Sequence, residues 1–289
     1  MSLHIARRAL PPALVVATFT GALAPALSSH GHAAARPGVA GHATMSAITL
    51  YASTFAFPKS VPAGMVKVTV VNDTTSEVEA GFGRANQGIT KQQLVSIIND
   101  QSEQGFIRAL HAITFVGGAS SVLAGQRESV VFNLTPGQYG VVNSDGKKPV
   151  YRLFTVTANG GQAATSEPMA TAAVQLKDFK FAQFPQHLKA GMTTFKLTNP
   201  SPMAHEMALI KLHQGKTIDD VKKALNNPGP PPAWALTEGG MDSMSPQTTG
   251  WLTLNLTPGR YVAVCFMPDT TKHGEPHAAE GMITAFSVS

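Results

Sequence analysis

Hydrophobic residues recur with a period of two along most of this chain, a pattern typical of β-strands that bury one face. The clearest such segments are Met65–Val71, Ser129–Leu134, Tyr139–Val142, Met192–Thr198, Gly250–Leu256 and Tyr261–Val264. Two other stretches follow a helical period behind a capping box, formed by Thr90 with Gln93 and by Thr217 with Asp220. The pattern predicts many short strands joined by turns, with one short helix inserted in each half.

Several of these segments occur twice in the chain. The sequence NLTPGQY at 133–139 matches NLTPGRY at 255–261, and Asn72 and Gly117-Gly118 match Asn199 and Gly239-Gly240. Motifs that recur in the same order indicate a repeated structural unit. We predict an all-β protein of two tandem Greek-key β-sandwiches, at 46–158 and 172–289, joined by a small polar linker at 159–171.

The first residues predict an export signal. Arg7 and Arg8 precede an apolar stretch at 9–27, and small residues follow it. We predict a signal at 1–35, cleaved at the alanine run 33–35 or alternatively near 24–26, and a flexible tail at 36–45. The arginine pair also allows a twin-arginine signal. The mature protein is expected in the periplasm or outside the cell, with no membrane span, because no other run approaches about 18 apolar residues.

Composition and charge limit the classes of partner that we expect for this protein. Charged residues make up only 13% of the chain and hydrophobic residues 43%, as suits a β-rich globular protein. The net charge of +5 falls to +3 once Arg7 and Arg8 leave with the signal. Since no dense basic patch is interleaved with aromatic residues, nucleic acid is not an expected partner.

The single cysteine is the most informative residue. An exported protein with one cysteine has no intramolecular disulfide, and a free thiol is prone to oxidation unless it is buried or binds a metal. Cys265 ends the strand that starts at Tyr261, and Pro276-His277 and Gly281-Met282 follow it. His205 opens another predicted strand after a proline-rich bend. Taken singly, each of these residues also has an ordinary structural interpretation.

Together these side chains form a recognised donor set. A thiolate, two imidazoles and a weak axial thioether hold one copper ion in mononuclear sites. We therefore predict one copper ion, cycling between Cu(I) and Cu(II), at His205, Cys265, His277 and Met282. His273 is the alternative to His277, and Glu206 and Glu280 are further candidate ligands if the centre is not of the blue type.

These segments resemble plastocyanin, azurin and their relatives, the cupredoxins, in which a Gly-x-Tyr strand leads to the ligand cysteine and Pro-His and Gly-Met complete the loop. The resemblance covers most of 172–289, and the first half only as a scaffold. It implies electron transfer to an unknown redox partner protein, with His277 near the surface and Phe266 and Met267 beside the docking patch. One departure is the eleven residues between Cys265 and His277, more than in plastocyanin-like loops.

The first half provides an internal comparison. By the repeat, Val78 corresponds to His205 and Asn143 to Cys265, so the first sandwich is expected to be metal-free. An enzyme is disfavoured, because multicopper oxidases and nitrite reductases need further histidine clusters and the only His-x-His pair, His30-Gly-His32, lies in the predicted signal. The alternatives to electron transfer are copper carriage or buffering, and a metal-free secreted binding module.

Overall fold

The structure is a computed structural model that describes residues 45–146, 148–158, 166–225, 232–272 and 274–289. The predicted signal at 1–35, the tail up to residue 44, the first part of the linker and His273 lie outside the described residues. None of the described helices is long and apolar enough to cross a membrane.

Strands dominate the described chain, as the period of two predicts. The strands are β1 (Ser46–Tyr51), β2 (Ser60–Pro62), β3 (Gly64–Val71), β4 (Val78–Ala85), β5 (Ile113–Val122), β6 (Arg127–Leu134), β7 (Gly137–Asn143), β8 (Val150–Thr157), β9 (Ala172–Lys177), β10 (Lys180–Ala182), β11 (His187–Leu188), β12 (Gly191–Thr198), β13 (His205–Leu212), β14 (Ala235–Met244), β15 (Thr249–Leu256), β16 (Gly259–Val264) and β17 (Ile283–Val288). The all-β fold class is confirmed.

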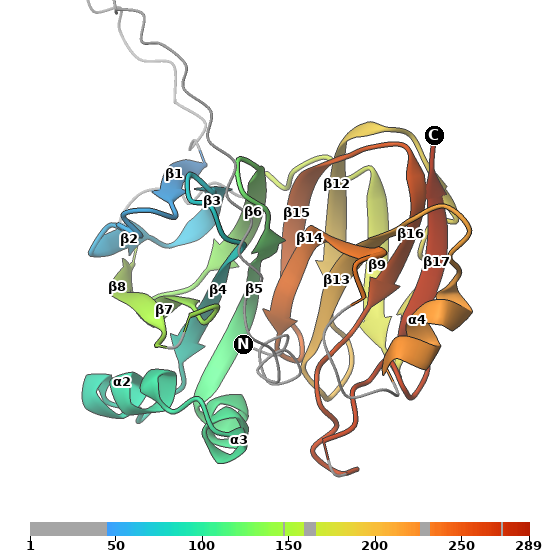
Figure 1. The fold of residues 1–289 in the computed structure, drawn as a ribbon. Coiled ribbons are helices and arrows are strands. Elements are labelled where there is room, and N and C mark those ends of the chain that lie inside the picture. The colour runs from blue at the N-terminus through green and yellow to red at the C-terminus, as the bar shows by residue number, and fades with distance from the viewer. Residues whose placement is uncertain (1–44, 147, 159–165, 226–231, 273) are drawn as a thin grey trace, which may run out of the picture.

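The strands form two sheets, and each sheet runs through both halves of the chain (Figure 1). One has the order β1-β3-β6-β15-β12-β9-β10, and the other has the order β11-β17-β16-β13-β14-β5-β4-β7-β8-β2. The halves meet where β6 pairs with β15 and β5 pairs with β14, both antiparallel. Read outward from these junctions, corresponding strands of the two halves follow in the same order. The boundaries 46–158 and 172–289 stay a prediction.

Matching aromatic pairs lie in the core of each half. The rings of Tyr139 and Phe154 stack with centroids 5.3 Å apart, and those of Tyr261 and Phe286 stack at 5.2 Å. Each tyrosine hydroxyl donates a hydrogen bond to a carbonyl four residues earlier, at Thr135 or Thr257. The buried ring is thus satisfied at its one polar atom, and it fixes the turn before β7 or β16.

The helices differ from the prediction in number. The two capping boxes form as expected and begin α2 (Lys91–Asn99) and α4 (Ile218–Leu225). The first half has an additional helix, α3 (Glu103–Ala112), so the prediction of one helix per half is wrong there. Ser102 caps α3 by accepting a hydrogen bond from the amide of Gly105. Figure 1 shows α2 and α3 side by side at one end of the first half.

A buried asparagine closes the same corner in both halves. The side-chain amide of Asn72 donates to the carbonyls of Ser76 and Val122, and that of Asn199 donates to the carbonyls of Met203 and Met244. Both asparagines are 1% exposed. Each corner anchors the bend that leads into the next strand, which is β4 in the first half and β13 in the second.

Candidate metal centre

The candidate ligands come from one end of the second sandwich. His205 is the first residue of β13, and Cys265 directly follows β16, which pairs with β13. His277 and Met282 lie in the segment between β16 and β17. Backbone hydrogen bonds hold the ends of this segment together. The Cys265 amide donates to the carbonyl of Met282, and the Met282 amide donates to the carbonyl of His277.

The long stretch between Cys265 and His277 folds back on itself. Pro268 and Pro276 form an antiparallel bridge, and the amide of Asp269 donates to the carbonyl of Glu275 at 2.8 Å. The His277 amide then donates to the Met267 carbonyl, also at 2.8 Å. The extra residues thus form a hairpin that leaves the site, and they do not separate His277 from Cys265.

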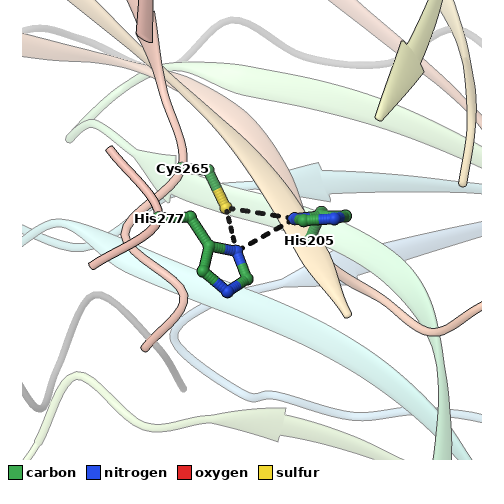
Figure 2. Close-up of side chains that lie close together, drawn as sticks. All are labelled: His205, Cys265 and His277. Carbon is green, nitrogen blue, oxygen red and sulfur yellow. Dashed lines mark hydrogen bonds between the residues drawn. The ribbon is translucent and has the colours of Figure 1, made fainter. Parts of the chain in front are cut away.

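Three side chains converge on one point. The Nδ1 atoms of His205 and His277 are 2.9 Å apart, and the Cys265 sulfur lies 3.9 Å and 3.5 Å from them. Figure 2 shows the sulfur facing both rings. The group is buried, since His205 and Cys265 are 0% exposed and His277 is 2% exposed. Within the described residues this is the one group of three or more His, Cys, Asp or Glu ligand atoms that lie within 4.8 Å of one another.

A chain of hydrogen bonds orients the His205 ring. The Asn199 side-chain oxygen accepts from the Ser201 amide, and the Ser201 hydroxyl accepts from the Met203 amide and lies 3.0 Å from His205 Nε2. Donation from Nε2–H to this hydroxyl leaves the Nδ1 lone pair facing Cys265 and His277. Such outer partners fix the tautomer and angle of a metal-binding histidine.

Glu206 stands beside the cluster without joining it. Its backbone amide donates to the Cys265 sulfur at 3.4 Å, while its carboxylate accepts from the amide of Phe266 at 2.9 Å. Burial, reinforced by Asp242, raises the pKa of the Glu206 carboxyl to about 8. A neutral carboxyl held by the backbone braces the turn after Cys265 and is a poor metal ligand.

Burial also sets the charge of the ligands. Burial, with His277 nearby, lowers the pKa of His205 to about 3, and burial lowers the pKa of His277 to about 4 although Asp269 opposes the shift. Both imidazoles are therefore neutral at pH 7 and offer lone pairs. Burial raises the pKa of the Cys265 thiol well above its ordinary value, and Glu206 adds to the effect. A cation bound here would compensate the buried thiolate.

The cluster fits a trigonal copper centre. Bond lengths of about 2.0 Å to nitrogen and 2.3 Å to sulfur place three trigonal ligand atoms about 3.5–3.7 Å apart. The observed separations of 2.9, 3.5 and 3.9 Å lie around these values. One thiol with two neutral imidazoles is the donor chemistry of mononuclear copper sites.

The structure brings together three of the four predicted ligands. Met282, the fourth, is 0% exposed and bonded through its backbone to Cys265 and His277, and its axial role stays a prediction. His273 lies outside the described residues. The Glu280 carboxylate makes an ion pair with Lys272. His277 is 2% exposed, not near the surface as expected, and the ring of Phe179 packs against it.

Two residues of the site were missed in the sequence. Ser201 follows Asn199 by two positions, as Thr74 follows Asn72, but only the second half has a histidine for this hydroxyl to contact. The ring of Phe179 packs edge-on against His277, with centroids 5.0 Å apart. The repeat contained the signal for Ser201, whereas nothing in the sequence places Phe179 over the site.

Two sheets that run through both halves and a buried His-Cys-His group at the end of β16 make up this architecture. This architecture is cupredoxin-like. Three features support this assignment: the two sheets, the hydrogen bonds of the Tyr139 and Tyr261 hydroxyls, and the His-Cys-His group. It confirms the fold that the sequence resemblance implied.

Several solved structures match this chain at low sequence identity. Auracyanin B matches with 20% identity over 43% of this chain and 93% of its own, at a TM-score of 0.29. An auracyanin from Roseiflexus castenholzii matches with 18% identity over 42% of this chain and 99% of its own, at 0.29. A copper nitrite reductase from Nitrosomonas europaea matches with 11% identity over 85% of this chain and 94% of its own, at 0.24. No family model and no curated protein matches the chain.

Removing the Ser201 hydroxyl should weaken metal binding. In Ser201→Ala the His205 ring loses its Nε2 partner, so we expect copper affinity to fall about 10–100-fold. Competition with a chelator of known affinity measures the change. Thr74→Ala, which removes the corresponding hydroxyl of the first half, is the control and should leave the affinity unchanged.

The two histidines also predict how pH affects the metal-free protein. Unfolded histidines bind protons near pH 6.5, whereas His205 and His277 in the folded chain bind them only near pH 3 and 4. Between about pH 4 and 6.5 the unfolded state therefore binds more protons, and the free energy of unfolding falls as pH falls. The free energy of unfolding measured with urea should be lower at pH 5 than at pH 7 by about 1–2 kcal/mol per histidine. In His205→Gln the difference should shrink, and an unchanged difference would contradict the buried neutral pair.

Proposed function

We propose that the protein is an exported copper protein that transfers electrons through one copper ion. His205, Cys265, His277 and Met282 would hold the ion. The observation that carries this proposal is the buried group of one sulfur and two Nδ1 atoms, all within 4.8 Å of one another. When bound, copper would supply a one-electron Cu(I)/Cu(II) couple.

The protein would keep the site rigid. His205 is held by Ser201, and Cys265 is held by the Glu206 amide and the Met282 carbonyl. Ligands fixed in this way need little rearrangement between the two charge states of a metal, and a low rearrangement energy favours fast electron exchange. The low exposure of all three side chains also keeps water from completing the coordination shell.

A pocket of about 230 Å³ gives His277 its route to a partner. Its walls come from α3, the bend before His205, the turn after β14 and the ligand hairpin, and His277 is one of its lining residues. A redox partner protein docked over this pocket would approach the copper through the His277 ring. Met267 lines the same pocket, whereas Phe266 does not.

We further propose an electron carrier and not an enzyme. The reason lies in the sequence, since the only His-x-His pair is within the predicted export signal at 1–35. Copper carriage is the second candidate, and a specific observation favours it: two methionines and a second histidine line the pocket beside His277.

The visible spectrum and the exchange rate of the copper-loaded protein test the function. We expect one copper per mature chain, an intense thiolate-to-copper absorption, and line broadening of NMR signals in mixtures of Cu(I) and Cu(II) protein. Slow exchange together with reversible metal release would favour carriage. A loaded protein without the thiolate absorption would contradict the proposed site.

A further inference from the structure

The pocket beside His277 has a lining suited to a soft metal ion. Met203 and Met267 contribute thioethers, and His111 of α3 contributes an imidazole beside the ligand imidazole of His277. Among the described residues that line it there is no carboxylate, lysine or arginine. Thioethers and imidazoles bind Cu(I) well, whereas hard cations prefer carboxylate oxygens.

Hydrogen bonds hold the segments of both methionines beside the candidate metal centre. The carbonyl of Met203 accepts from Asn199, two residues before His205. The carbonyl of Met267 accepts from the His277 amide at 2.8 Å, and its sulfur accepts a weak hydrogen bond from Ser243. Both methionines therefore belong to the same short segments as the ligands.

The opposite wall belongs to the half without ligands. The carbonyl of His111, in the last turn of α3, accepts from the Asn86 side chain at 2.9 Å. The start of the same helix faces the ligand hairpin, where a Cβ at Gly274 would lie 3.7 Å from Glu103 Oε1. The His111 side chain is exposed and can turn toward the pocket without disturbing the helix.

A buried metal centre needs a path for its ion. His205 and Cys265 are 0% exposed, so an ion from solvent reaches them only past the residues that cover them. The pocket volume of about 230 Å³ has room for several water molecules at about 30 Å³ each, and so for an ion that is still partly hydrated.

We propose that this pocket is a Cu(I)-acquisition site in which Met203 and His111 capture the ion before it passes to the buried ligands. The proposal rests on the proposed copper function. In the transfer Cu(I) exchanges thioether and imidazole ligands for Cys265, His205 and His277, and the Cys265 thiol releases its proton to water. No electron moves in this step, and copper remains Cu(I) throughout.

The rate of copper uptake tests the proposal. Apo-protein is mixed with the Cu(I)–bathocuproine disulfonate complex, and the loss of chelate colour is followed by stopped flow. In the Met203→Leu/His111→Gln double variant, which keeps all the buried ligands, we expect uptake of one equivalent of Cu(I) per chain to slow about tenfold or more. At this single equivalent, the final copper content and the visible spectrum after oxidation should stay as in the wild type. The matched control is Met169→Leu/His213→Gln, which removes an exposed methionine and an exposed histidine elsewhere.

A titration gives a second measurement. With excess Cu(I), wild type and control should bind one equivalent more per chain than the pocket variant. Equal uptake rates in the pocket and control variants, or equal stoichiometry, would overturn the acquisition site. Failure of the proposed function looks different, because wild-type protein would then lack the thiolate-to-copper absorption whatever its loading rate.

Discussion

Cys265→Ser should abolish the thiolate-to-copper absorption and lower copper affinity by more than about 100-fold, because loss of outer-shell partners alone costs 10–100-fold. The sulfur lies 3.5 Å and 3.9 Å from the two histidine nitrogens, so its removal takes away the donor that would bond copper most covalently. Visible and EPR spectra of protein titrated with Cu(II), together with chelator competition, measure both effects.

The first half supplies the control for this substitution. Asn143 corresponds to Cys265 by the repeat and ends β7 as Cys265 follows β16. Asn143→Ser should leave the spectrum and the affinity unchanged. Copper content and absorption that survive in Cys265→Ser would show that the thiolate is not a ligand.

Asn199→Ala should cost both stability and metal binding. The substitution removes a buried hydrogen bond to the carbonyl of Met244 and a partly buried one to the carbonyl of Met203, and leaves both acceptors without this donor. We expect the free energy of unfolding to fall by about 2–4 kcal/mol. Copper affinity should also fall by about 10–100-fold, because the bend that carries Ser201 and His205 loses its anchor.

Asn72→Ala separates the two effects. This asparagine makes the corresponding bonds in the first half, to Ser76 and Val122, and is equally buried. Its loss should destabilise the protein to a similar extent in urea unfolding, with little change in copper affinity. If both variants lost affinity equally, the corner at Asn199 would have no special role in the site.

Much of the fold could be predicted from periodicity. The six predicted strands lie within observed strands, with ends that differ by one or two residues, since alternation fixes which face is buried but not where pairing stops. Helix α3 could not be predicted in this way. Its third residue is Gly105, needed because a Cβ there would meet the Asp100 carbonyl oxygen at 2.2 Å, and glycine in a first turn does not indicate a helix.

The ligand group could be predicted because its spacing reflects chemistry that the fold alone does not require. His205 and Val78 open equivalent strands, so one scaffold accepts either residue. The surroundings of these residues could not be predicted from the sequence. The hairpin between Pro268 and Pro276, the ring of Phe179 and the wall formed by α3 depend on contacts between distant segments, and no local pattern records them.

The junctions β6–β15 and β5–β14 have a consequence for the half without ligands. If 172–289 were cut from the rest, β14 and β15 would each lose a hydrogen-bonded neighbour and present unpaired backbone groups to other chains. Bare strands of this kind template aggregation, and proteins commonly protect them with a cover. The first half therefore covers the open strands of the second half, and a chain trimmed to the second half should self-associate.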